Sequence, residues 1–175
     1  MPPDCISFVN GVDVFGAQPP QAFPHRFAVV TWFSQGPDSA MPWPLLRLAE
    51  PRLRELSGAN VSYAELWDRR RRWIFFWKPI KIREAPLSEW LAKSDKELND
   101  QDDFPVKLRF ERNGEVALWM ETERWDLIGG IPDIYHDSVT LSFFSKYDLS
   151  KKLEDLFRTE AGKLGVLIKE APQPG

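Results

Sequence analysis

The sequence predicts an α+β protein with one domain, in which helices pack on one face of a mostly antiparallel sheet. Three observations lead to this fold class. Residues 106–121 alternate as two strands around the turn-forming pair Asn113-Gly114, and residues 138–145 alternate as a further strand. Residues 149–157 then carry leucines at helical spacing. Hairpin-paired strands with helices between them favour an antiparallel sheet.

The length of 175 residues suits one domain, which we expect to span residues 25–170. Residues 1–24 hold five of the 15 prolines and are expected to form an irregular N-terminal arm. Residues 171–175 are expected to be a flexible tail. A hydrophobic fraction of 43% and a charged fraction of 28% are typical of soluble globular proteins.

The first predicted strand runs from Arg26 to Ser34 and has apolar residues on both faces, which indicates an interior strand. Leu45 to Leu56 has leucines at helical spacing, although Pro51 is expected to kink or divide that helix. Ser62 and Glu65 have the spacing of a capping box, which predicts a short helix.

Residues 73–78 are predicted to form another strand, and a second helix is expected to begin near Pro86. The apolar positions of that helix are Leu87, Trp90, Leu91 and Leu98. Prolines interrupt the pattern within residues 38–78, so the secondary structure there stays open.

The hairpin register follows from the burial pattern. A two-residue loop would pair Phe110 with Ala117 and would place apolar and charged side chains on one face. A three-residue loop, with Gly114 left-handed, pairs Phe110 with Val116 and separates the two kinds of side chain. We therefore expect the bulged three-residue loop.

Two contacts are expected on the outer face of that hairpin. Lys107 is predicted to lie opposite Trp119 as a cation–π pair, because Trp119 points away from the apolar face. Glu111 is predicted to face Glu115, a mild repulsion between solvated carboxylates.

The last third of the chain is predicted to contain a helix and a short strand. Asp148 is the expected N-cap of the helix. Gly162 or Gly165 is expected to end it, and residues 166–168 are predicted to form the final strand.

A run of four arginines, Arg69 to Arg72, precedes aromatic residues and invites three interpretations. The first interpretation is a platform for nucleic acid, and the second is a solvated helix end before a core strand. The third is a set of cations that face carboxylates. The net charge of −3 and the pI near 5.5 weigh against nucleic acid. Whether the arginines pair internally or form a binding patch stays open.

The segment from Trp125 to Ser138 contains Asp133, His136 and Asp137, which are residue types that bind metals. A metal site usually needs three or four protein ligands, and one histidine is nearby. Gly129-Gly130 and Pro132 favour a structured recognition loop instead. The sequence therefore predicts neither a metal nor another cofactor.

This same segment, continued through Phe144, resembles bacterial immunity proteins of polymorphic toxin systems. The shared features are Trp125, the Gly129-Gly130-Ile131-Pro132 stretch and the Tyr135-His136-Asp137-Ser138 stretch that leads into a strand. The resemblance implies a non-enzymatic cytoplasmic protein that binds and blocks a cognate toxin.

Catalytic patterns are not expected. Cys5, the single cysteine, has no basic neighbour to lower the pKa of its thiol, and no nucleophile-elbow or phosphate-binding glycine pattern occurs. The sequence predicts a cytoplasmic location, since it shows no signal peptide, no membrane span and no possible intrachain disulfide. Acidic residues between 95 and 103 are expected to be solvated or to steer a basic partner.

The favoured function is binding of another protein, since eight tryptophans exceed what a core of this size requires. The predicted binding surface consists of Trp43, Trp119, Trp125, Asp133, Tyr135, His136 and Asp137. The competing hypothesis is a small-molecule enzyme or ligand-binding domain, with a tryptophan-lined pocket around His136. The oligomeric state stays open.

Overall fold

The computed structural model describes residues 5–10, 23–34, 42–68, 72–73, 76–77, 80–94, 97–98, 106–125 and 136–170. The strands are β1 (Cys5–Asn10), β2 (His25–Ser34), β3 (Val61–Asp68), β4 (Arg72–Trp73), β5 (Phe76–Trp77), β6 (Ile80–Pro86), β7 (Val106–Arg112), β8 (Glu115–Trp125), β9 (His136–Ser145) and β10 (Leu167–Ile168). The helices are α1 (Trp43–Ser57), α2 (Leu87–Leu91) and α4 (Ser150–Leu164).

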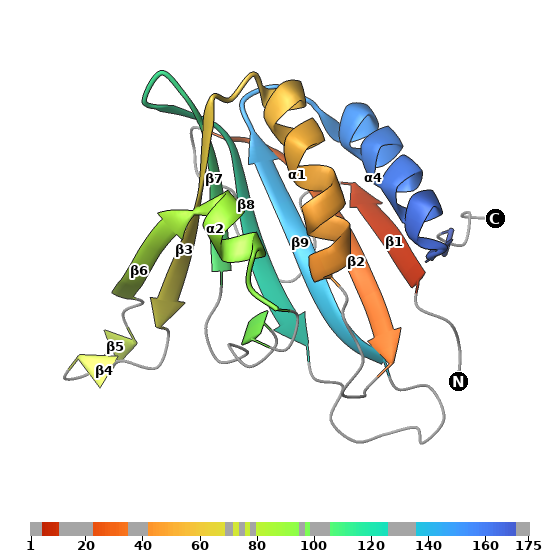
Figure 1. Cartoon of the computed structure of the whole chain (residues 1–175), viewed down its shortest axis with the longest axis horizontal. Coiled ribbons are helices and arrows are strands. Elements are labelled where there is room, and N and C mark those ends of the chain that lie inside the picture. The colour runs from red at the N-terminus through yellow and green to blue at the C-terminus, as the bar shows by residue number, and fades with distance from the viewer. Residues whose placement is uncertain are drawn as a thin grey trace.

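An eight-stranded sheet, in the order β10-β1-β2-β9-β8-β7-β3-β6, carries the fold. All neighbouring strands are antiparallel except β1 and β10. The helices α1, α2 and α4 lie on one side of this sheet (Figure 1). The predicted α+β class, with a mostly antiparallel sheet and helices on one face, is confirmed.

The hydrophobic core fills the space between the sheet and the helices. Its largest fully buried side chains include Phe110, Phe143 and Phe157, with Leu45, Leu53 and Leu108. The interior position predicted for residues 26–34 is also confirmed, because β2 lies between β1 and β9 and successive side chains from Phe27 to Val30 are buried.

Pro51 was expected to kink or divide the helix, and the division is wrong because α1 is continuous through Pro51. Pro51 is exposed, whereas Ala49 and Leu53 are fully buried. Proline cannot donate the backbone hydrogen bond of the helix at this position. The core packing of the flanking residues compensates for the loss of that bond. Gly58, at φ 69°, ends the helix in the left-handed conformation.

Three local predictions are wrong. Residues 61–68 form β3, and the capping-box spacing that was expected at Ser62 is instead realised at Ser94, whose backbone N–H and Oγ bond Glu97 at 2.9 and 3.2 Å. Residues 5–10 of the expected irregular arm form β1. The single strand expected at 73–78 is a pair of two-residue strands, β4 and β5.

The second helix is shorter than predicted, because α2 ends at Leu91 and Leu98 lies beyond it. The predicted apolar positions are nevertheless all buried, with exposed fractions between 0 and 8%. The described residues do not include 1–4, 11–22, 69–71 or 171–175, so most of the predicted arm, most of the arginine run and the predicted tail lie outside them.

The turn of the β7–β8 hairpin contains two residues, so the predicted three-residue loop is wrong. Asn113 (φ 52°) and Gly114 (φ 83°) form the turn, and Arg112 pairs with Glu115. Glu115 therefore does not pair with Glu111, and the predicted facing of these two carboxylates is wrong. Both turn residues have positive φ, as a tight hairpin turn requires.

The bulge of this hairpin lies in the strand and not in the turn. Val116 pairs with Glu111 and Leu118 pairs with Phe110, which leaves Ala117 as the extra residue of β8. The predicted burial face is confirmed, because Phe110, Leu118 and Met120 have no exposed surface. The register was wrong by two residues, which preserves the face on which each side chain lies.

The C-terminal elements agree with the predicted ones. Helix α4 ends at Gly165 (φ 68°), and β10 follows. The predicted N-cap is wrong by one residue, because Leu149 is the N-cap and Asp148 precedes it. Asp148 Oδ1 still accepts a hydrogen bond of 3.1 Å from the Ser150 N–H. None of the helices in the described part of the chain has the length and apolar character needed to cross a membrane.

Helices α1 and α4 are joined by a buried carboxylate. Glu160, with 1% of its surface exposed, accepts hydrogen bonds of 3.0 Å from Arg52 and 3.2 Å from Lys163. Burial alone would raise the pKa of Glu160, but these two cations outweigh it and hold the pKa below its usual range.

A Glu160→Gln variant therefore tests the contribution of this pair. Because the pKa is lower in the folded state, the stabilisation is present above the unfolded pKa of about 4.3 and is lost as the pH falls through the folded value. We expect the free energy of unfolding, measured by urea denaturation from about pH 7 to about pH 3, to fall more steeply for the wild type than for the variant. Parallel slopes would contradict the assignment.

Candidate functional site

The structure separates the residues of the predicted binding surface. Trp43 is buried in the core. Trp119 is half-buried and lies on the face of the sheet opposite the helices. Trp125 pairs with Ser138, and His136 begins β9, so these backbone positions adjoin at one end of two neighbouring strands. The side chains of Trp125, His136 and Asp137, and residues Asp133 and Tyr135 altogether, lie outside the described part of the structure.

The assignment of Trp43 to a recognition surface is wrong. Only 8% of its surface is exposed, and it belongs to the main hydrophobic core. The prolines on either side suggested a surface loop, but Pro42 is the N-cap of α1 and Pro44 lies in its first turn, where proline is tolerated. Trp43 is thereby the first residue of a helix that packs on the sheet.

The candidate site is a group of polar and aromatic side chains on the outer sheet face, which we call the outer-face network. It spans β3, β6, β7 and β8, and every member contacts another member. Its residues are Tyr63, Glu65, Trp67, Lys81, Glu84, Lys107, Arg109, Glu111, Trp119 and Glu121.

Arg109 is the centre of the outer-face network. Its guanidinium donates to three carboxylates: Glu65 through Nη1, Glu84 through Nη2 at 2.8 Å and Glu111 through Nε at 2.7 Å. The guanidinium also lies 4.9 Å from the centre of the Tyr63 ring. One side chain of β7 thus binds residues of β3 and β6, and its five N–H donors suit this arrangement.

Glu65 is the most buried member, at 3% exposure. Besides Arg109, its carboxylate accepts a hydrogen bond of 3.0 Å from the Trp67 indole N–H. Lys81 lies 3.7 Å from the same carboxylate. A buried carboxylate requires this set of partners, because an unpaired charge at such a position is strongly destabilising.

Lys107 connects two tryptophans. Its Nζ lies 4.4 Å from the Trp67 ring and 5.6 Å from the Trp119 ring, and Glu121 lies 3.4 Å away. Glu121 also accepts a hydrogen bond of 3.1 Å from the Trp119 indole N–H. The predicted contact between Lys107 and Trp119 is confirmed, although the residue paired with Trp119 is Arg109.

The hydrogen bond between Lys81 and Glu84 favours the ionised form of both groups. Hydrogen bonds from Lys81 and then Arg109 lower the pKa of Glu84. The hydrogen bond to Glu84 raises the pKa of Lys81 despite some desolvation. General acid–base catalysis needs a group that titrates near the working pH, and both shifts move the pKa values of Lys81 and Glu84 away from neutral pH.

Other site types find no support among the described residues. Their acidic, histidine and cysteine side chains include no group of three or more that could hold a metal. Two cavities bounded by described residues have volumes of about 630 and 270 Å³, and neither lining includes a tryptophan or histidine. The competing hypothesis of a tryptophan-lined pocket around His136 thus remains a prediction.

Sequence reasoning found Lys107 and Trp119 but missed the rest of the outer-face network. A signal was present, because every second position is charged or aromatic at 63, 65 and 67 and is charged at 107, 109 and 111. Alternation in strands puts such positions on one face. It was missed at 63–67 because that segment was expected to be a helix.

Comparisons with protein-family profiles, with curated proteins and with solved structures give no match to this chain.

Removal of the Arg109 guanidinium tests whether it holds this sheet face together. We expect Arg109→Met to lower the free energy of unfolding by about 3 kcal/mol, because buried Glu65 would lose its main cationic partner. Urea denaturation measures this loss. The matched control is Arg158→Met, which removes the exposed bonds of Arg158 to Glu154 and Glu170 and should cost less than about 1 kcal/mol. Equal losses in the two variants would show that Arg109 has no special role.

Proposed function

We propose that this chain is a non-enzymatic protein-binding module, and specifically an immunity protein that binds and blocks a cognate toxin. The observation that carries the proposal is the outer-face network, which holds tryptophan, tyrosine and arginine side chains at partial exposure. These side chains alternate along their strands with the core residues Ala64, Leu108 and Leu118, so they lie on the other face of the sheet. Tryptophan, tyrosine and arginine are enriched among the few residues that dominate the binding energy of protein interfaces.

Rigidity of these side chains supports the proposal. Both indole N–H groups bond a carboxylate, and both arginine and lysine lie against aromatic rings. Side chains that are already held in one rotamer lose less conformational entropy when a partner binds. The network contains four carboxylates and three cations, so a partner would meet a pattern of alternating charge.

The immunity assignment is supported by the resemblance at residues 125–144. The described ends of that segment, β8 up to Trp125 and β9 from His136, continue strands that are neighbours in the sheet. A net charge of −3 suits a toxin with a basic surface, since opposite charges accelerate association. A single cysteine suits the reducing cytoplasm.

Growth of a host cell provides the first test. The protein encoded directly upstream of this chain's gene is expressed with and without this chain. We expect that protein to stop growth by itself, and we expect co-expression of this chain to restore growth and to yield a stable complex. A neighbour that neither arrests growth nor binds the purified chain would overturn the toxin assignment.

Substitution of the network tryptophans locates the binding surface. We expect Trp67→Ser and Trp119→Ser each to weaken the affinity for that partner by roughly tenfold or more, because interface tryptophans are typical hot spots. Isothermal titration calorimetry measures the affinity, and circular dichroism confirms that each variant is folded. Tyr147→Ser is the matched control, because Tyr147 is a 77% exposed aromatic residue outside the network. A larger loss for Tyr147→Ser than for both tryptophan variants would place the interface elsewhere.

A further inference from the structure

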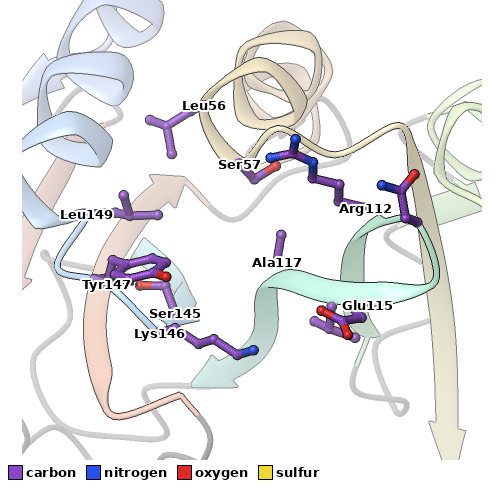
Figure 2. A pocket seen from close by; sticks show the side chains of 11 residues that line it. Leu56, Ser57, Arg112, Glu115, Ala117, Ser145, Lys146, Tyr147 and Leu149 are labelled. Atoms are coloured by element: carbon purple, nitrogen blue, oxygen red, sulfur yellow. Dashed lines mark hydrogen bonds between the residues drawn. The ribbon is translucent and has the colours of Figure 1, made fainter.

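A cavity of about 630 Å³ lies at one end of the sheet, and we call it the sheet-end cavity. Three connections surround it: the end of α1, the β7–β8 turn and the segment between β9 and α4. Figure 2 shows that Leu56 and Leu149 lie on one side of this space and Ala117 faces it from β8. Cavities of this size are typical of sites for small organic ligands.

The local backbone explains why the space is not filled. The bulge at Ala117 places a methyl group where a larger side chain would occupy the cavity. Gly58 ends α1 and turns the chain toward β3, so Leu56 and Ser57 are the last helical side chains at the cavity. The Asn60 N–H donates to the Glu111 carbonyl at 2.9 Å and ties this turn to β7.

The apolar part of the lining comes from all three connections. Leu56, Leu149 and Val116 are half-buried, as is Ala117, so each still has surface that a ligand could cover. Burial of apolar surface contributes about 25 cal/mol for each Å² that is removed from water. The cavity therefore suits a ligand with an apolar body.

Two cations line the cavity without a protein partner in the described structure. Arg112 extends toward the end of α1, and Lys146 approaches from the β9–α4 side (Figure 2). Neither forms a hydrogen bond or an ion pair with a described residue, whereas Arg52, Arg54 and Arg109 all bind carboxylates. Glu115 also lines the cavity, so the lining has one net positive charge.

Two carbonyl oxygens near the C-terminal end of α1 already have hydrogen-bond donors, so they are poor partners for Arg112 and Lys146. The carbonyls of Arg54 and Glu55 accept the backbone N–H groups of Ala59 and Gly58, and Ser57 Oγ also donates to the Arg54 carbonyl. The carbonyl oxygens of Arg54 and Glu55 thus already accept hydrogen bonds. The two cations remain available to an anion from solution.

We propose that the sheet-end cavity binds a small organic carboxylate. The carboxylate group is held by Arg112 and Lys146, and the apolar body lies against Leu56, Ala117 and Leu149. This site is separate from the outer-face network and does not depend on the protein-binding function.

Hexanoate and hexanamide provide a matched pair of probes, because they share an apolar chain and differ in charge. Amide chemical shifts of the ¹⁵N-labelled chain are followed by NMR during titration. We expect hexanoate to produce saturable shifts at residues 56–57, 112–117 and 145–149, with a Kd on the order of 1 mM, as suits a ligand of this size. Hexanamide should bind at least roughly tenfold more weakly.

Three variants connect these shifts to the cavity. Arg112→Met and Lys146→Met should each weaken hexanoate binding several-fold, and Ala117→Leu should abolish it by filling the space. Arg83→Met is the matched control, since Arg83 is an exposed arginine outside the cavity and should leave the affinity unchanged. The same spectra report whether each variant is folded.

Other outcomes overturn the proposal. Equal affinity for hexanoate and hexanamide would show an apolar cavity with no anion site. The absence of saturable shifts at about 10 mM probe would show no ligand site at all. Tighter binding of the blocked peptide acetyl-Gly-Glu-Gly-amide than of hexanoate would assign the cavity to a protein side chain instead of a small molecule.

Discussion

The hydrogen bonds from Arg109 to three carboxylates are the interaction on which one half of the sheet depends. Strand β6 is the last strand in the sheet order, and β3 alone connects it to β7. Through Arg109, a side chain of β7 binds Glu65 of β3 and Glu84 of β6 at the same time. A carboxylate as buried as Glu65 is tolerated because these partners are present, and the partners are positioned because the carboxylate is there.

This constraint gives the sheet two chemically different faces. The helix-covered face is packed with leucine and phenylalanine, so it stabilises the fold through apolar burial. The other face, over β3, β6, β7 and β8, is organised by ion pairs and by cations against aromatic rings. Such a surface combines a defined shape with a defined charge pattern, and the proposed binding of a protein partner relies on both. The sheet-end cavity is a separate feature, created where the bulge at Ala117 leaves room beside α1.

The fold class and the buried faces could be predicted because alternation and helical spacing are local patterns. The hairpin shows the limit of that approach. Its apolar face was predicted correctly, but its register was not, because the extra residue is Ala117 in the strand and not a residue of the turn. Burial alternation cannot distinguish registers that differ by two residues. Trp43 was misplaced for a related reason, since Pro42 and Pro44 resemble a loop until the core contacts of α1 are known. The outer-face network joins residues from four strands, so its assembly depends on a strand order that no local pattern contains.

The coupling free energy between Glu65 and Arg109 tests the central claim most directly. A double-mutant cycle with Glu65→Gln, Arg109→Met and the double variant, followed by urea denaturation, measures it. The account predicts a favourable coupling of about 2 kcal/mol or more, because each residue leaves the other buried without its partner. Additive effects of the two substitutions would contradict the account, since they would show that this sheet face is held together without Arg109.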